Sequence, residues 1–285
     1  MVERCVEKLL FICALVCVMA TILIFGCMIV SGFPILRQCN LLSILSTGWI
    51  PDKGIYGIGP MIAGTLSIAL LAVFFSVPIS LGCSLSIYFF SGKKEAWLLN
   101  WLIRIMTGIP TVIYGFAGVF LVTPIFREHL RTGSGLCILS AALMLSLLIS
   151  PTLILFFTES FARVPRSYCN ATDALGGTLS QKILYIILPC SFRGMLTGIV
   201  LALGRALGDT LIALMMAGNA VAFPDSVFSS ARTLTAHIAL IIAADFDSIE
   251  FRTLFLCGMV LYIFTSMLTL AVRRIGAFEK AGESG

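Results

Sequence analysis

Two charged residues inside an otherwise apolar stretch are the first candidates for chemistry. Arg205 and Asp209 interrupt a hydrophobic region that runs from about residue 189 to residue 218. They are four residues apart, so on a helix they share one face and can pair. A guanidinium group stays charged and presents a planar fork that matches the oxygens of an oxyanion. The pair therefore predicts either a buried contact between helices or the lining of an anion path.

Other reactive constellations are missing from the sequence. GxxxxGK[ST], HExxH and GxSxG do not occur, so motifs for nucleotide phosphates, zinc and a nucleophilic serine are absent. The ten cysteines include no CxxC pair and are expected to pack as small apolar side chains. His129 and His237 are expected in solvated loops. We therefore expect no catalytic residue, no metal site and no cofactor on this chain.

The composition indicates a membrane protein. Of the 285 residues, 59% are hydrophobic and 12% are charged, and the mean hydropathy is +1.05. A soluble domain carries about 25% charged residues, and so few polar groups could not cover the apolar surface in water. The net charge of +5 is modest and the basic residues are dispersed, which argues against binding to nucleic acid. A polytopic membrane protein is the class that remains.

Stretches without charged residues locate six membrane-spanning helices, since about 20 apolar residues cross a bilayer. The apolar runs are continuous and do not alternate, which favours an all-α bundle over a β-barrel. Residues 54–60, rich in Gly and Pro, are expected to form a turn or a short surface helix before the second span. Pro110 predicts a kink or break within the third span. The predicted spans cover residues 9–30, 62–90, 102–124, 136–157, 191–217 and 253–272.

Six spans place both termini on one side of the membrane. If that side is the cytoplasm, twelve of the nineteen Lys and Arg residues are inside, as the positive-inside rule favours. The N-terminal apolar run is longer than that of a signal peptide and no A-x-A site follows, so we expect an uncleaved helix. Three parts are predicted: an N-terminal helix with an outer loop (1–60), a transmembrane core (61–275) and a short cytoplasmic tail (276–285).

The longest predicted cytoplasmic connection, residues 158–193, contains ordered pieces. Pro165 can begin a helix, and Gly176 with Gly177 can end it. A second helical stretch over residues 179–188 is expected to stop at Pro189. Two helices around a glycine turn are suited to docking a partner protein, and a plain solvated connector is an equally good interpretation.

This connection resembles the cytoplasmic motif of type I ABC importer permeases, whose fold is called MetI-like. Those proteins carry E-A-A-x-x-x-G, nine further residues, and then I-x-L-P. The present chain keeps the spacing throughout, with Asn170 in place of Glu and Thr172 in place of the second Ala. In that family the short helix inserts into a groove of the ATPase subunit, and Asn170 weakens any ion pair there but leaves the shape intact. The resemblance assigns ATPase coupling to Asn170, Ala171, Thr172, Asp173, Ala174, Leu175 and Gly176.

Other segments resemble the phosphate importer permeases of the PstC type. Those permeases have an Arg matching Arg205 and an acidic residue after it, usually Glu where this chain has Asp209. The resemblance therefore implies that Arg205 and Asp209 line the substrate path. The segments that carry it are Trp49-Ile50-Pro51 with Tyr56-Gly57-Ile58, GIPTVIYG (108–115), LGRALGDT (203–210), AGN (217–219) and RTLT (232–235).

The resemblance implies a permease subunit of an ATP-driven phosphate importer, multi-pass in a bacterial inner membrane with both termini cytoplasmic. The implied partners are a second homologous permease of the PstA type, two ATPase subunits and an extracytoplasmic phosphate-binding protein, with lipid around them and no nucleic acid. ATP would be used by the partner subunits, and this chain would not be an enzyme. The alternatives are a permease for another oxyanion (sulfate, molybdate or tungstate) and an ion-coupled secondary carrier with Asp209 as proton site.

Overall fold

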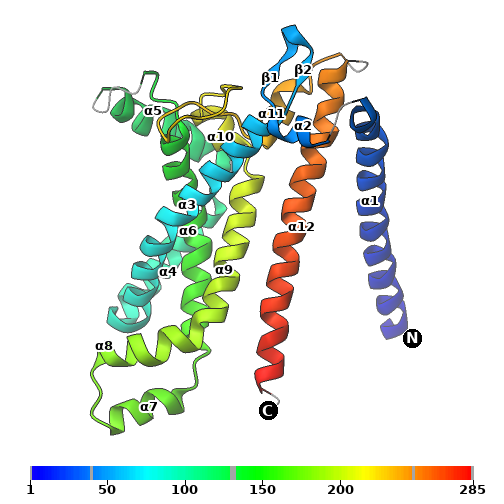
Figure 1. The fold of residues 1–285 in the computed structure, drawn as a ribbon. Helices are drawn as coiled ribbons and strands as arrows, with labels where there is room; N and C mark the ends of the chain where they lie inside the picture. The colour runs from blue at the N-terminus through cyan, green and yellow to red at the C-terminus, as the bar shows by residue number, and fades with distance from the viewer. Residues whose placement is uncertain (1, 39–40, 129–132, 246–247, 284–285) are drawn as a thin grey trace.

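The fold is a bundle of membrane-length helices. A computed structural model describes residues 2–38, 41–128, 133–245 and 248–283. Within these ranges six helices are long and apolar enough to cross a membrane, which confirms the all-α class and the predicted number of spans. Both termini lie at the end of the bundle that carries α7 and α8, and a small β-hairpin lies at the opposite end (Figure 1). The six spans are Val6–Gly32, Gly59–Phe90, Thr111–Glu128, Ile138–Ala162, Leu179–Gly208 and Ile249–Arg274.

The centre of the bundle is α6 (Ile138–Ala162), the most buried of the spans. Its neighbours are α3 (Gly59–Leu85), which continues through a π-helical turn η2 (Ser86–Phe90), and α9 (Leu188–Gly208). Gly194 and Gly198 of α9 lie so close to α6 that a Cβ at either position would collide with it. Small residues therefore allow these two backbones to approach, as expected for helices packed in lipid.

One helix stands apart from this bundle. The first helix, α1 (Val2–Gln38), packs against α12 (Ile249–Glu283) at the edge of the molecule (Figure 1). The ring of Phe25 lies 4.5 Å from the ring of Tyr262, centroid to centroid. Most other side chains of α1 that the structure describes are exposed and apolar. Such a surface suits contact with lipid acyl chains.

The predicted third span, residues 102–124, is wrong as a single helix. The chain forms α4 (Lys93–Gly108), leaves helical geometry at Ile109 and begins α5 (Thr111–Glu128) one residue after Pro110. Ile109 has φ −71° and ψ 126°, the extended conformation that a following proline favours. The break at Pro110 confirms the predicted interruption. The span is α5, and α4 is an amphipathic helix that buries Ile103.

The predicted fifth span, residues 191–217, is also wrong in its extent. The helix α9 ends at Gly208, the backbone is extended at Asp209 (φ −71°, ψ 131°), and a short helix α10 (Leu211–Met216) follows. The break falls at Gly208-Asp209-Thr210 between two apolar stretches, so hydropathy averaged over the region does not reveal it.

The helix that precedes α9 does not stop at Pro189. Instead α8 (Leu179–Lys182), a π-helical turn η3 (Ile183–Ile187) and α9 follow one another without interruption. Pro189 is the second residue of α9, and the wider π turn before it changes the hydrogen-bond spacing where the proline nitrogen has no proton to donate.

Opposite the α7–α8 end, residues 49–56 form a hairpin instead of the expected turn or surface helix. Its strands β1 (Trp49–Ile50) and β2 (Ile55–Tyr56) are joined by a 3₁₀ turn η1 (Pro51–Lys53), with Gly54 in the left-handed region at φ +68°. The short helix α2 (Leu41–Ser46) precedes the hairpin. These elements cover the outer ends of α3 and α12 (Figure 1).

The expectation that His237 is solvated is wrong. It lies in α11 (Leu234–Ile241), is completely buried, and meets the Trp49 ring edge to face with 4.6 Å between ring centroids. Sequence position suggested a loop, but the hairpin folds over this helix and excludes water. His129 lies outside the described residues.

Candidate functional site

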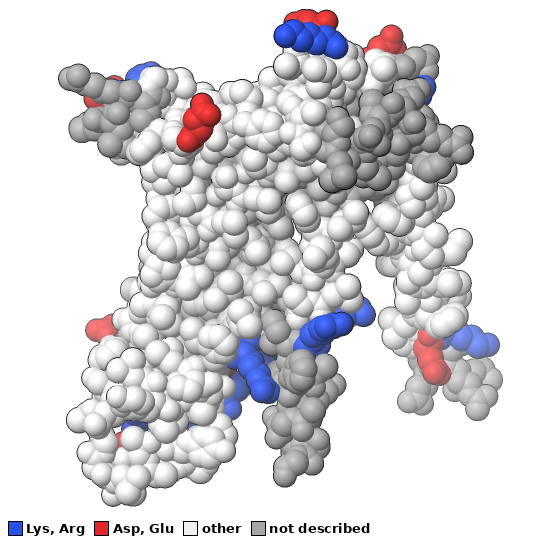
Figure 2. Space-filling model, viewed as in Figure 1, with Lys and Arg blue, Asp and Glu red and all other residues white. Residues whose placement is uncertain are grey.

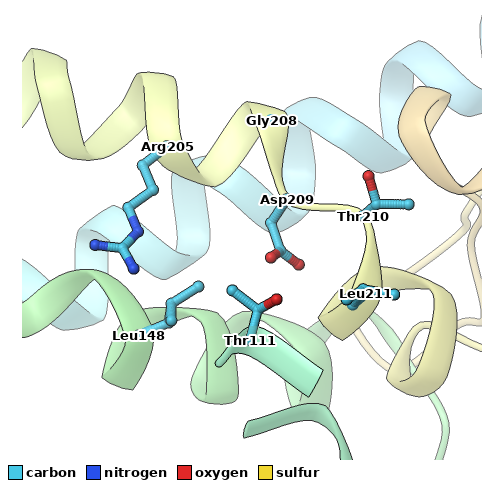
Figure 3. Close-up of a pocket in the computed structure, with 7 residues that line it drawn as sticks. All are labelled: Thr111, Leu148, Arg205, Gly208, Asp209, Thr210 and Leu211. Atoms are coloured by element: carbon cyan, nitrogen blue, oxygen red, sulfur yellow. The ribbon is translucent and has the colours of Figure 1, made fainter. Parts of the chain in front are cut away.

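The predicted pair, Arg205 and Asp209, lines one cavity of about 360 Å³. The cavity lies where α9 gives way to α10, against the start of α5 and the middle of α6 (Figure 3). Both charged side chains extend into this space, Arg205 from α9 and Asp209 from the extended residue that follows it. The complete lining is Thr111, Leu148, Arg205, Gly208, Asp209, Thr210 and Leu211.

The guanidinium of Arg205 is held by a residue of another helix. Its Nη1 donates a hydrogen bond of 3.0 Å to Oγ1 of Thr152, which belongs to α6. Thr152 lies one helical turn from Leu148, which also lines the cavity. A neutral hydroxyl thus orients the guanidinium without cancelling its charge.

Asp209 has different partners from the one predicted. Its Oδ2 accepts the backbone N–H of Ile212 at 2.9 Å, and its carbonyl oxygen accepts the hydroxyl of Thr235 at 2.8 Å. The carboxylate therefore closes the first turn of α10, where backbone N–H groups have no helical acceptor. The carbonyl joins the end of α9 to α11.

The predicted pairing of Arg205 with Asp209 on one helix face is wrong. Among the described residues no ion pair joins them, and the three pairs that form are elsewhere. The reason is local: α9 ends at Gly208, so the four-residue helical spacing does not extend to Asp209. The two residues share a cavity, and within the described ranges no carboxylate forms an ion pair with the guanidinium.

A network of hydrogen bonds supports the cavity from the side of the β-hairpin. The backbone N–H of Asn219 donates to the carbonyl of Ala231 at 3.1 Å, and Nε of Arg232 donates to the carbonyl of Asn219 at 3.0 Å. Thr235, which bonds to Asp209, also bonds to the hydroxyl of Thr233 at 3.0 Å. Segments 203–210, 217–219 and 232–235, far apart in the sequence, therefore meet in one structure.

The predicted coupling motif lies in the projecting α7–α8 hairpin (Figure 1). The helix α7 (Arg166–Ala174) begins after Pro165 and ends two residues before Gly176, which has φ +74°. Backbone N–H groups of Gly176 and Gly177 donate to the carbonyls of Asp173 (3.0 Å) and Thr172 (2.9 Å), the pattern of a Schellman motif. The predicted start and end of this helix are confirmed.

The two arms of the hairpin are joined by charge. Asp173 of α7 and Lys182 of α8 form an ion pair of 2.5 Å. Six of the seven predicted coupling residues are exposed and Thr172 is half-buried, so their surface is open to a partner. Leu175 is 88% exposed and is the apolar side chain at the end of α7. The α7–α8 hairpin therefore projects from the bundle, is braced by an ion pair, and exposes Leu175 at the end of α7.

Sequence reasoning missed Thr152, Thr111 and Thr210. Thr111 and Thr210 line the cavity and Thr152 binds Arg205, and these residues come together only when α5, α6 and α9 are packed. Thr111 and Thr210 lie within the segments 108–115 and 203–210 singled out from the sequence, whereas no signal marked Thr152. Within the described ranges no group of three or more His, Cys, Asp or Glu residues is placed to hold a metal ion.

Comparisons with known proteins agree on one family. Residues 76–277 match the family described as binding-protein-dependent transport system inner membrane component. The probable ABC transporter permease protein YqgH of Bacillus subtilis is 28% identical over 94% of this chain and 89% of its own length. The phosphate transport system permease protein PstC of Xylella fastidiosa is 31% identical over 80% of this chain and 76% of its own length.

Solved structures share the fold. A chain of the inward-facing MetNI methionine ABC transporter superposes with a TM-score of 0.57 at 18% identity, over 80% of this chain and 96% of its own. A chain of an amino acid ABC transporter gives a TM-score of 0.52 at 17% identity, over 75% of this chain and 92% of its own. The expected MetI-like fold is confirmed.

Proposed function

The chain belongs to the family of binding-protein-dependent transport system inner membrane components, and we propose from this that it is the phosphate permease subunit of an ATP-driven importer. As an ABC importer permease it is a multi-pass inner-membrane protein that works with a partner permease, an ATPase and a substrate-binding protein. Phosphate as the substrate and a PstA-type permease as the partner are the specific parts of the proposal.

One observation carries the choice of an oxyanion. The Arg205 guanidinium lines a cavity of about 360 Å³ between spanning helices and has a neutral hydroxyl, not a carboxylate, as its bonded partner. A charge in that position is unfavourable by about 2.5–3.5 kcal/mol on insertion scales unless it meets water or a partner. An anion passing through the cavity meets that requirement and leaves again, as conduction demands. PstC-named relatives support phosphate as that anion.

In this proposal transport through the chain is driven by ATP hydrolysis that takes place on other subunits. ATP is bound and hydrolysed by two partner ATPase subunits, and this chain holds no cofactor and catalyses no reaction. The projecting α7–α8 hairpin inserts into the ATPase, with residues 170–176 at its surface. Closure of the ATPase dimer moves the hairpin, and the bundle alternates between outward and inward access. The ATPase side, and with it both termini, is cytoplasmic.

The test is reconstitution of the complete transporter in proteoliposomes, with its binding protein and ATP. We expect phosphate to stimulate ATP hydrolysis and uptake, and sulfate, molybdate and tungstate to do so weakly. Stimulation by one of those anions and not by phosphate would assign the chain to that anion instead. Uptake without ATP would contradict the proposal altogether.

Replacement of Arg205 tests the cavity itself. We expect Arg205→Ala and Arg205→Lys to reduce phosphate uptake by about 10-fold to 100-fold, the cost of losing charge-assisted hydrogen bonds. Arg127→Ala is the matched control, because Arg127 is exposed at the end of α5 and pairs with its neighbour Glu128. Normal uptake and normal ATPase coupling in both Arg205 variants would remove this residue from the mechanism.

A further inference from the structure

Thr152 differs from the other hydroxyl-bearing residues of its helix. Four of them donate to carbonyl oxygens of α6 itself, one turn back, which satisfies them within the helix. Thr152 instead reaches across to α9 and accepts a proton of the Arg205 guanidinium. The four that bond within the helix are Ser146, Ser150, Thr158 and Ser160.

The hydrogen-bonding capacity of Arg205 is mostly unused. A guanidinium has five N–H donors in a fixed plane. Among the described residues Thr152 is its one hydrogen-bond partner, and it takes a proton of Nη1. The remaining donors are available to a ligand in the cavity that Arg205 lines. Asp209 forms no ion pair with Arg205 among the described residues, and its Oδ2 accepts the N–H of Ile212.

From this geometry we infer that Thr152 is the positioning residue of the oxyanion site, a role that rests on the proposed function. It fixes one corner of the guanidinium plane against α6, so that the other N–H groups face the cavity as a fork. A tetrahedral oxyanion presents pairs of oxygens that match this fork. The oxygen of Thr152 accepts from Arg205, and Thr152 itself is not among the lining residues, so its role is to orient the guanidinium and not to contact the ligand.

A neutral partner suits a transport site better than a charged one. A carboxylate in the place of Thr152 would bind Arg205 with the same fork and compete with the substrate for it. A hydroxyl orders the long side chain, which otherwise loses rotamer entropy when the anion binds, yet it leaves the full positive charge. Loss of the hydroxyl should therefore weaken substrate recognition more than the later steps of transport.

The experiment compares Thr152→Val, Thr152→Ser and Thr158→Val in the complete transporter reconstituted with ATPase, partner permease and binding protein. Valine keeps the shape of threonine without the hydroxyl, and serine keeps the hydroxyl. Thr158→Val is the matched control, since this half-buried residue of the same helix bonds to the Ile154 carbonyl. Uptake of labelled phosphate is measured against phosphate concentration, and basal ATP hydrolysis is measured without phosphate.

We expect Thr152→Val to raise the half-saturating phosphate concentration by about 10-fold, the size expected for one hydrogen bond to a charged group. The maximal rate should change by less than about twofold, and Thr152→Ser and Thr158→Val should resemble wild type. In an Arg205→Lys background Thr152→Val should have little further effect, because the two residues act as one unit. That non-additivity separates a positioning role from a loss of packing.

Three results would overturn the inference: an unchanged half-saturating concentration in Thr152→Val, an equal loss in Thr152→Ser, or a full additional loss in the Arg205→Lys background. If Thr152→Val does not assemble, Thr152→Ala, which also lacks the hydroxyl, replaces it in both the single-variant and the double-variant comparison. Failure of the proposed function looks different, because then wild-type transporter itself shows no stimulation by phosphate.

Discussion

At the scale of single residues, the contacts of Asp209 change the meaning of the charged pair. Spacing alone joins it to Arg205, but the end of α9 at Gly208 turns it toward α10. The short side chain of an aspartate can accept a backbone N–H from the first turn of the helix that follows it, as the Asp209 carboxylate does from Ile212. The sequence thus predicted two of the residues that line the cavity, Arg205 and Asp209, and mispredicted how they are bonded, because the bonds depend on where one helix ends.

His237 shows the same limit, and it also gives a test of the fold. It is completely buried in α11, outside the six spans, and neither ring nitrogen has a hydrogen-bond partner in the described structure. Burial, with the nearby charge of Arg232, lowers the pKa of His237 from 6.5 to about 4. The folded protein therefore holds this imidazole neutral while the unfolded chain protonates it at ordinary pH values.

We expect His237 to make folding sensitive to mild acid. Because its pKa is lower in the folded state, its contribution to stability is complete above pH 6.5 and is lost as the pH falls toward 4. The loss amounts to about 3 kcal/mol at the lower limit. The apparent midpoint of thermal unfolding in detergent should fall more steeply with acid in wild type than in His237→Leu, which has no such group. Parallel curves for the two proteins would contradict the prediction.

At the scale of the helices, the sequence predicted the number of membrane spans and their helical type better than the residues at which the helices begin and end. Charge-free stretches found six spans because lipid excludes charge, and Pro110 marked one break because it lacks an N–H. The break after Gly208 lies at a Gly-Asp-Thr sequence that was interpreted as part of one span, and the π-helical turn η3 lies in apolar sequence with no proline or glycine to mark it. Pro165 and Gly176 marked the start and end of α7, whereas Pro189 was misleading because the helix continues through it.

The turn η3 (Ile183–Ile187) sets the direction of that hairpin, and this can be tested by deletion. A π turn contains about one more residue than an α turn, and such turns are places where helices kink. Deletion of Tyr185 should convert η3 into regular α-helix, which removes the kink and changes the direction of the hairpin relative to α9. We expect unchanged helicity by circular dichroism and basal ATP hydrolysis by the complex, with stimulation by phosphate largely lost.

The substitution Tyr185→Ala is the control for that deletion. It removes the same exposed side chain but keeps the length of the chain, so the hairpin retains its direction. We expect it to keep most of the stimulation. If the deletion couples as well as the alanine variant, η3 does not orient the hairpin.

At the scale of the whole molecule, most of the charged side chains lie at the two ends of the bundle. A broad band without charged side chains crosses the visible surface, with acidic and basic groups above and below it (Figure 2). The band matches the height of the spanning helices in Figure 1 and marks where lipid contacts the protein. The hairpin carries Asp52 and Lys53 at one end, and the end with α7 and α8 carries most of the basic residues.

The orientation that follows is a prediction about the whole molecule: the α7–α8 end is cytoplasmic and the β-hairpin is outside. It can be tested with single cysteines in a background in which the native cysteines, several of them exposed, are replaced by serine or alanine. Asp52→Cys and Leu175→Cys suit this test, because both positions are exposed and lie at opposite ends of the bundle. A membrane-impermeant maleimide applied to spheroplasts should label position 52 at once and position 175 only after the membrane is opened. The reverse pattern would place the β-hairpin in the cytoplasm and residues 170–176 outside, beyond the reach of a cytoplasmic ATPase. It would contradict the coupling proposal as well as the orientation.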